Sequence, residues 1–444
     1  MIDIDPGLFA LLMFGALLVG VMTGYPLAFI VGAVSVLFGY IVFGNGMFSF
    51  FFARVFAMVH NYTLLAIPLF IYMGMMLQRA GISERMYAAL YVWLGGLRGG
   101  LAIVTVVMGA IMAACVGVVG ASVTMLGLVA LPSMLKRGYD KSLASGAVCG
   151  GGTLGVLIPP SVPLVVYGTM AYISVGKLFM GAIMPGLLLT GLYVGQIAVR
   201  AFLKPALAPA IPVEERHMPV LQKTHMLITS LLPTVILIFS VLGVIFLGVA
   251  APTEAAAVGA LASTVLALVY GRLTWDVVKE VSLVTLRISS MIFMIAATSF
   301  VFTGVFLGAG CGTAVQELIL STPGGRWSGF LAIMGIIFIL GYFIDVLVVI
   351  FIMVPILGPL IPALGLDPLW FAIMFNLNLQ TAWMTPPYAI SIFYLAGVLK
   401  PEWGVNTNHI IRGVWPYIAL ILVGMAICIA FPDIILWLPR MMIK

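Results

Sequence analysis

Charged residues are scarce in this sequence. Of its 444 residues, only 8% are Asp, Glu, Lys or Arg, whereas ordinary soluble domains carry about 25%. Hydrophobic residues make up 63% of the chain, and its mean hydropathy is +1.25. A surface with so few charges cannot face water, which excludes a soluble enzyme, a disordered chain and a secreted disulfide scaffold. The class that remains is a multi-pass membrane protein.

Motifs for catalysis and for tightly bound metals are missing as well. The histidines show no metal-ligand or haem-ligand spacing, and no GxxxxGK[ST] loop for ATP is present. We therefore expect no enzymatic activity and no organic cofactor. The net charge of +6 is spread thinly, which fits loops beside anionic membrane lipid and argues against nucleic-acid binding. The cysteines form no CxxC pair and are expected to be small buried hydrophobes; they are Cys115, Cys149, Cys311 and Cys428.

Long uncharged intervals set the expected number of membrane segments. No Asp, Glu, Lys or Arg lies between Asp5 and Arg54, or between Arg98 and Lys136. A spanning helix needs about 20 apolar residues, so such intervals hold two spans, or a span and a re-entrant hairpin. Strands of a membrane barrel alternate in polarity, whereas these runs are apolar on every face. We expect an all-α polytopic protein with about 10 to 14 membrane-crossing or re-entrant segments.

The polar segments give a first topology. Residues 1–5 are acidic, where a cleavable signal would be basic, so we expect an uncleaved N-terminus on the outer side. The longest polar stretch, 200–225, contains four Lys or Arg residues and four prolines. It is expected to be a cytoplasmic connector between two halves of the chain.

The two halves resemble each other in the spacing of Pro and Gly. Two Pro-Pro pairs are 227 positions apart, and so are two glycines upstream of them. Two further proline landmarks are separated by 223 and 226 positions. We interpret the halves, 1–225 and 226–444, as inverted structural repeats, which are typical of secondary transporters. The landmarks are Pro159-Pro160 with Pro386-Pro387, Gly138 with Gly365, Pro132 with Pro355, and Pro26 with Pro252.

Each Pro-Pro pair interrupts an apolar segment, 150–161 in the first half and 376–388 in the second. Proline cannot continue a helix but suits the first position of a new one, so each segment predicts two half-helices with an unwound stretch between them. Unwound backbone at membrane depth requires surrounding protein or a cavity. The alternative for either segment alone is an ordinary proline kink. We expect a sodium site at Gly150, Thr153, Gln380, Thr381 and Thr385, and an anion site near Pro160, Ser161, Pro387 and Tyr388.

Two further segments, 118–127 and 340–345, are expected to be re-entrant hairpins that face these breaks. Ser122 and Asp345 each lie ten residues before a proline landmark, which predicts that they are symmetry mates. A carboxylate at membrane depth is costly, so Asp345 is a candidate for ion coupling, with a helix cap as the alternative. Ser122 and Thr124 are the candidate sodium ligands of the first hairpin. Arg287 is expected to extend its charge from an amphipathic segment towards the membrane surface.

Several of these motifs resemble those of a known family. The run Gly-Gly-Thr-Leu-Gly-Val-Leu-Ile-Pro-Pro-Ser-Val-Pro at 151–163 is similar to the signature of the large membrane subunit of TRAP transporters, the tripartite ATP-independent periplasmic uptake systems. Similar runs at 98–101, 136–140, 252–257 and 385–387 extend the resemblance over nearly the whole chain. Family members often carry an Asp after the first hairpin tip, where Thr124 and Met125 stand here. In this respect the chain resembles the subgroup named for mannitol and chloroaromatic compounds.

The resemblance implies a function and partners. It implies sodium-coupled uptake of a small organic acid, such as a C4-dicarboxylate or a 2-oxo acid, across the bacterial inner membrane. It also implies an elevator mechanism, a periplasmic solute-binding protein that delivers the acid, and a small four-helix membrane subunit. Two alternatives remain open: a stand-alone sodium/carboxylate symporter of a related elevator family, and a non-transporting membrane anchor subunit. The absence of paired haem-type histidines argues against the anchor.

Overall fold

The computed structural model describes residues 5–117, 119–210 and 219–442, which form α-helices and short 3-10 turns without a β-strand. Seven of these helices are long and apolar enough to cross a membrane, and an eighth span results if the bent pair α3 and α4 is counted as one. Six shorter apolar helices of 10–17 residues accompany them. The expected all-α polytopic fold, a mixture of full spans and partial ones, is confirmed.

The helices of the first half and their bounds are α1 (Pro6–Met22), α2 (Leu27–Phe43), α3 (Gly46–Val59), η1 (Tyr62–Leu65), α4 (Ala66–Arg79), α5 (Ile82–Leu94), α6 (Gly100–Val116), α7 (Val119–Lys136), α8 (Lys141–Thr153), η2 (Leu154–Val156), α9 (Val162–Ala171), α10 (Val175–Leu203) and η3 (Pro205–Leu207). Those of the second half are α11 (Val220–Phe246), α12 (Pro252–Val269), α13 (Trp275–Gly308), α14 (Cys311–Leu320), α15 (Gly325–Phe343), α16 (Val346–Leu357), α17 (Leu360–Ala363), α18 (Pro368–Ala382), α19 (Ile390–Gly397), η5 (Pro401–Trp403), α20 (Thr407–Ala430) and α21 (Asp433–Met441).

Equivalent helices begin with the same local chemistry in both halves. The Asp140 side chain accepts a hydrogen bond of 2.8 Å from the backbone N–H of Leu143 and caps α8. Asp367 caps α18 in the same way, through the N–H of Trp370 at 2.9 Å. An acidic cap satisfies a backbone donor that the helix itself leaves free. The two capping residues are 227 positions apart, as are the Pro-Pro pairs.

The positions at which the helices begin show that two of the residue pairings expected from the sequence are wrong: Pro132 with Pro355, and Ser122 with Asp345. Val119 and Val346 begin α7 and α16 and are also 227 positions apart. With this offset Pro132 corresponds to Pro359 rather than Pro355, so the pairing of Ser122 with Asp345 is wrong by four positions. The reason is that Pro132 lies inside α7 and Pro355 lies inside α16, so neither proline marks a helix boundary that could fix the alignment. The interpreted boundary between 225 and 226 falls inside the continuous helix α11.

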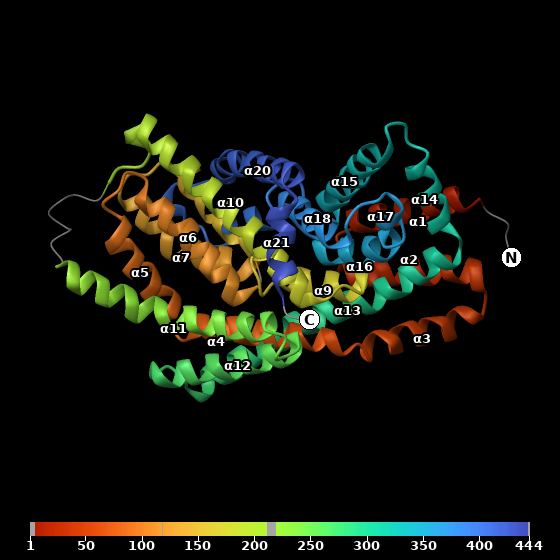
Figure 1. The fold of residues 1–444 in the computed structure, drawn as a ribbon, viewed down its shortest axis with the longest axis horizontal. Helices are drawn as coiled ribbons and strands as arrows, with labels where there is room; N and C mark the ends of the chain where they lie inside the picture. Colours follow the sequence, from red (N-terminus) through yellow and green to blue (C-terminus); the bar gives the residue numbers. More distant parts are fainter. Residues whose placement is uncertain (1–4, 118, 211–218, 443–444) are drawn as a thin grey trace.

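The two halves interlock in space. Five helices, α3, α4, α11, α12 and α13, which we call the arm helices, lie along the lower edge of Figure 1, with most of the remaining helices above them. Within the arms, α12 of the second half packs on α4 of the first, and so does α13. An ion pair between Arg79 and Glu280 joins α4 to α13. Above the arms, α7 packs on α19 and α16 packs on α9, so each half contributes to both layers.

Glycines allow α8 to occupy the centre of this arrangement. A Cβ atom on Gly146 would lie 2.2 Å from the carbonyl oxygen of Gly413 in α20. One on Gly151 would lie 3.0 Å from the carbonyl oxygen of Thr105 in α6, and one on Gly152 would lie 2.4 Å from Val123 in α7. Small residues let membrane helices approach this closely. The glycine run therefore belongs to a packed helix and is not part of the unwound stretch.

Candidate functional site

The first broken helix consists of α8 and α9, joined through η2 and residues 157–161. The Pro159-Pro160 bond in this connection is cis. Helix α9 begins at Val162, two residues after the position expected from the proline pair. The hydroxyl of Ser161 donates a hydrogen bond of 2.5 Å to the carbonyl oxygen of Val156. The connection and both adjoining helix ends are largely buried. The Ser161 donor is therefore used inside the connection and does not point freely at a ligand.

The second broken helix consists of α18 and α19, joined by residues 383–389. The Pro386-Pro387 bond is also cis, and α19 begins at Ile390. The hydroxyl and the backbone N–H of Ser391 both donate to the carbonyl oxygen of Trp383, at 2.7 and 3.0 Å. Pro386 and Pro387 are exposed, in contrast to the buried Pro160 of the first break. The second break is the one that opens to the outside of the protein.

The two breaks lie side by side in the interior. The hydroxyl oxygen of Thr153, at the end of α8, is 3.7 Å from the sulfur of Met384 in the second break. The sulfur of Cys149 is 3.7 Å from the carbonyl oxygen of Ser391. All four residues are buried. Positions predicted separately in the two halves of the sequence are thus neighbours.

Each hairpin turn touches the break of its own half. Asp345, between α15 and α16, caps α16 through a 2.8 Å hydrogen bond from the N–H of Leu347. Its other carboxyl oxygen accepts a 2.9 Å hydrogen bond from the hydroxyl of Tyr388. In the first half, Gly117 adopts a φ of +61° after α6, and a Cβ atom there would lie 2.9 Å from the carbonyl oxygen of Pro160. Asp345 is therefore a helix cap and also a neighbour of a predicted binding residue.

The predicted hydroxyl ligands form bonds along their own helices. Thr153, Thr381 and Thr385 donate to the carbonyl oxygens of Gly150, Asn378 and Thr381 at 3.0, 2.6 and 2.8 Å. A donating hydroxyl keeps lone pairs on its oxygen that a cation can use. In α7, the buried Ser122 and the half-buried Thr124 stand on either side of Val123 at its contact with Gly152.

One face of α18, extended by the residue that follows it, carries buried polar atoms without a hydrogen-bond partner among the described residues. They are the side-chain oxygen of Asn376, the amide oxygen and nitrogen of Gln380, and the indole nitrogen of Trp383. The spacing of four and three positions puts these side chains on one face of the helix. A buried polar atom without a partner costs about 1–3 kcal/mol, so this face is suited to a polar or charged ligand. Gln380 was predicted, whereas this spacing could have identified Asn376 and Trp383 and was overlooked.

No group of three or more His, Cys, Asp or Glu side chains capable of holding a metal ion occurs within residues 5–117, 119–210 and 219–442. A cation bound near the breaks would be held by neutral oxygens together with Asp345. Hard oxygen ligands of this kind suit a small alkali or alkaline-earth cation and do not suit a soft metal.

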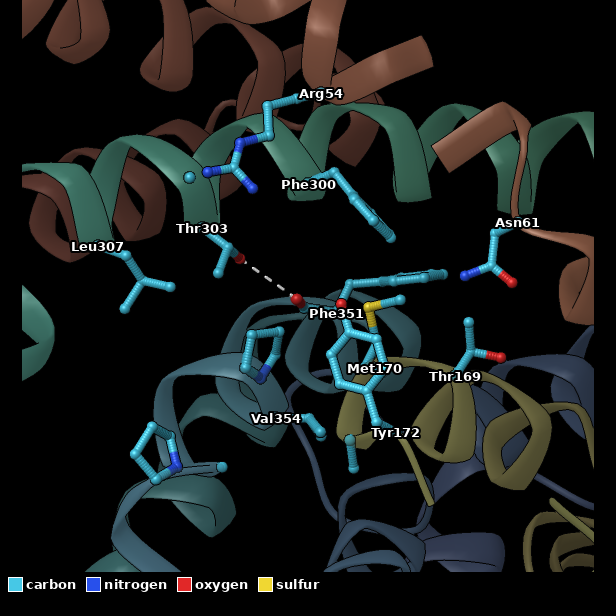
Figure 2. A pocket seen from close by; sticks show the side chains of 15 residues that line it. Arg54, Asn61, Thr169, Met170, Tyr172, Phe300, Thr303, Leu307, Phe351 and Val354 are labelled. Carbon is cyan, nitrogen blue, oxygen red and sulfur yellow. Dashed lines mark hydrogen bonds between the residues drawn. The ribbon is translucent and has the colours of Figure 1, made fainter. Parts of the chain in front are cut away.

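A cavity of about 440 Å³ lies between the arm helices α3 and α13 on one side and the C-terminal ends of α9 and α16 on the other. Figure 2 shows it between Arg54 and Asn61 on one side and the end of α9, with Thr169 and Tyr172, on the other. The hydroxyl of Thr303 in α13 donates a 3.3 Å hydrogen bond across this boundary to the carbonyl oxygen of Phe351 in α16. Apart from its position at the end of a long uncharged interval, nothing in the sequence distinguishes Arg54 as a site residue.

Comparison with known proteins gives one consistent family. Residues 14–434 match the family described as "Tripartite ATP-independent periplasmic transporter, DctM component". The chain is 32% identical over 389 residues to the C4-dicarboxylate TRAP transporter large permease protein DctM of Pseudomonas aeruginosa, covering 87% of this chain and 88% of that protein. It is 30% identical over 428 residues to the isethionate TRAP transporter permease protein DctMQ of Oleidesulfovibrio alaskensis, covering 95% of this chain and 65% of that protein.

The fold also has a counterpart among solved structures. The YdaH transporter of Alcanivorax borkumensis superimposes with a TM-score of 0.65 over 92% of this chain and 98% of that one. The sequence identity is 15%, so the likeness concerns the fold alone.

Proposed function

Because the chain belongs to the DctM component family of tripartite ATP-independent periplasmic transporters, we propose that it takes up a small organic acid in symport with sodium. As a member of this family it is a multi-pass membrane permease subunit, and its relatives are named as transporters rather than enzymes. Membership of the family does not by itself include sodium coupling, the class of acid or an elevator motion, and these three properties are what we propose. The subgroup named for mannitol and chloroaromatic compounds stays a prediction.

The observation that carries the proposal is the convergence of two matched broken helices in the interior. Thr153 and Met384 bring the breaks into contact, and Asp345 contacts the second break through Tyr388. Paired broken helices at a repeat interface are the usual setting for substrate and coupling-ion sites in secondary transporters. The unpartnered amide of Gln380 supplies oxygen for a cation in the same region.

An organic acid fits the same arrangement. The second break is open at Pro386 and Pro387, and the positive end of the α19 helix dipole, which favours a negative group, lies beside it. The relatives compared above are named for C4-dicarboxylate and for isethionate, both anions. We propose that the substrate is a carboxylate of similar size, either a C4-dicarboxylate or a 2-oxo acid.

The division into layers supports an elevator motion. The arm helices form one layer along the edge of the molecule, and α18 of the second broken helix lies above it. The cavity of about 440 Å³ lies along the boundary between them. We propose that the layer with the breaks and hairpins moves against the arms in the bacterial inner membrane. A periplasmic solute-binding protein would deliver the acid, and a small four-helix membrane subunit would complete the arms.

The test is uptake by the complete system in proteoliposomes. The chain is reconstituted with its binding protein and small subunit, and radiolabelled acids from both classes are supplied outside. Accumulation under an inward sodium gradient is expected, with none when potassium or choline replaces external sodium. Equal accumulation in all three salts would reject sodium coupling. Uptake without the binding protein would instead favour a stand-alone symporter.

A further inference from the structure

The cavity between the arm helices and the hairpins contains a single charged side chain. Of the 15 residues that line it, Arg54 alone is charged. Asn61, Thr169 and Thr303 add neutral polar groups. No acidic residue faces the guanidinium from within the cavity, so the electrostatic potential there is positive and favours an anion.

Arg54 has its hydrogen-bonding capacity available. Its guanidinium lies 4.9 Å from the centre of the Phe50 ring. Across residues 5–117, 119–210 and 219–442, no side chain or carbonyl forms an ion pair or a hydrogen bond with it. A guanidinium carries several N–H donors in a planar fork that matches a carboxylate in two-point contact. The exposed position of Arg54 leaves this fork accessible.

The neighbouring arm helix α13 leaves room for the Arg54 side chain. A Cβ atom on Gly304 of α13 would lie 2.8 Å from the Nε atom of Arg54 and 2.7 Å from the end of the Phe50 ring. Glycine at 304 thus allows the guanidinium and the ring to lie against α13. Thr303, the preceding residue, connects the same wall to α16 of the second hairpin.

A separate observation shows why a positive charge here would matter. Neither break has a Lys, Arg or His close to it in the sequence: the interval between Gly146 and Lys177 has none, nor does the interval between Asp367 and Lys400. A carboxylate at the breaks therefore finds no basic side chain from either interval. The cavity is the place where residues of both halves, α9 and α16, meet a basic side chain.

We propose that Arg54 binds the carboxylate of the substrate in this cavity, between the arm helices and the broken helices. Arg54 is then a substrate-binding residue carried by the arm layer, whereas the breaks belong to the layer that moves. The proposal rests on the proposed transport function, and it commits to a substrate with at least one oxyanion. A lipid phosphate has the same chemistry, and Phe48, Phe52 and Phe56 on the same helix are exposed.

The first experiment measures uptake by the complete complex over a range of acid concentrations. Arg54→Gln is expected to raise the half-saturating concentration roughly tenfold to hundredfold, the effect of losing a hydrogen bond to a charged group. Arg54→Lys keeps the positive charge but lacks the planar fork of N–H donors. Its half-saturating concentration should lie between those of the parent and of Arg54→Gln. Arg287→Gln is the matched control, because Arg287 is also an exposed arginine on an arm helix and does not line the cavity. It should leave the half-saturating concentration unchanged.

The second experiment tests occupancy of the cavity directly. Arg54→Cys is treated with a cationic thiol reagent, trimethylammonium-ethyl methanethiosulfonate, or with its anionic sulfonate analogue. The cationic reagent should restore affinity for the acid and the anionic one should not. The acid should slow labelling of Arg54→Cys and leave labelling of Arg287→Cys unchanged.

The outcomes separate this proposal from the proposed function. Normal sodium-driven uptake by Arg54→Gln with unchanged half-saturation, or labelling that the acid does not slow, would overturn the Arg54 site alone. A lower maximal rate that varies with the anionic lipid content of the vesicle, at constant half-saturation, would also overturn it and assign Arg54 to a lipid phosphate. If the acid slows labelling of Arg54→Cys but uptake does not depend on sodium, the Arg54 site is supported and sodium coupling is rejected.

Discussion

The hydroxyl of Tyr388 donates a hydrogen bond of 2.9 Å to the carboxyl group of Asp345. This contact joins the turn of the second hairpin to the unwound segment of the second broken helix. The other carboxyl oxygen of Asp345 caps α16, so one side chain links three elements. If the second break moves relative to the hairpin, this hydrogen bond must break.

Replacing Tyr388 by Phe removes this hydrogen bond and keeps the ring. We expect the half-saturating sodium concentration to rise roughly tenfold to hundredfold, since a hydrogen bond to a charged group is worth about 1.5–3 kcal/mol. The measurement is sodium-dependent uptake at saturating acid. Tyr394→Phe is the control, because that side chain lies one turn along α19 and is exposed. Equal sodium dependence in the two variants would remove Tyr388 from the coupling site.

Asp345→Asn separates the two roles of this residue. Asn caps helices about as well as Asp, so folding and membrane expression should be retained. The carboxylate is lost, and sodium dependence should therefore be lost with it. Thermal stability of the purified protein and sodium-driven uptake are measured together. Stability close to the parent with normal sodium-driven uptake would leave Asp345 as a helix cap only.

Gln380→Leu tests the unpartnered face of α18. Removing a buried polar group without a partner should leave stability without sodium equal or raised by up to about 1–3 kcal/mol. If the Gln380 oxygen binds sodium, the rise in melting temperature caused by sodium should shrink in this variant. Gln78→Leu is the control, because Gln78 also has a buried unpartnered oxygen but lies in the arm helix α4. Identical sodium effects in both variants would argue against Gln380 as a ligand.

Gly146→Ala tests the close packing of α8. The added methyl would lie 2.2 Å from the carbonyl oxygen of Gly413 and 2.7 Å from its carbonyl carbon. Both are backbone atoms, which cannot rotate away. We expect a loss of about 1–3 kcal/mol, typical of overpacking. Gly195→Ala in α10 has nothing within 4 Å and should be neutral or stabilising. Similar melting temperatures for the two variants would contradict the packing described for α8.

The sequence could predict the elements with strong local signals. The Pro-Pro pairs located both breaks, because proline interrupts a helix whatever surrounds it. Side-chain partners depend on contacts between distant segments and were less predictable. Ser161 bonds within its own connection, and Gly150–152 pack against neighbouring helices.

The cavity and its arginine could not have been predicted from one sequence. Arg54 is separated from Thr169 by 115 positions and from Thr303 by 249, and they meet only because the halves interlock. The pairing of Ser122 with Asp345 failed for a related reason. Pro355 and Pro359 both lie near the expected offset, and only the helix ends decide between them.

The most direct measurement is the entry of radioactive sodium into proteoliposomes that contain the complete complex. Coupling is reciprocal, so an acid that depends on sodium must in turn promote sodium binding and entry. External acid is expected to stimulate sodium entry strongly in the parent complex and to have no effect in Asp345→Asn. Sodium entry that is the same with and without acid in the parent complex would contradict sodium-coupled transport by this protein.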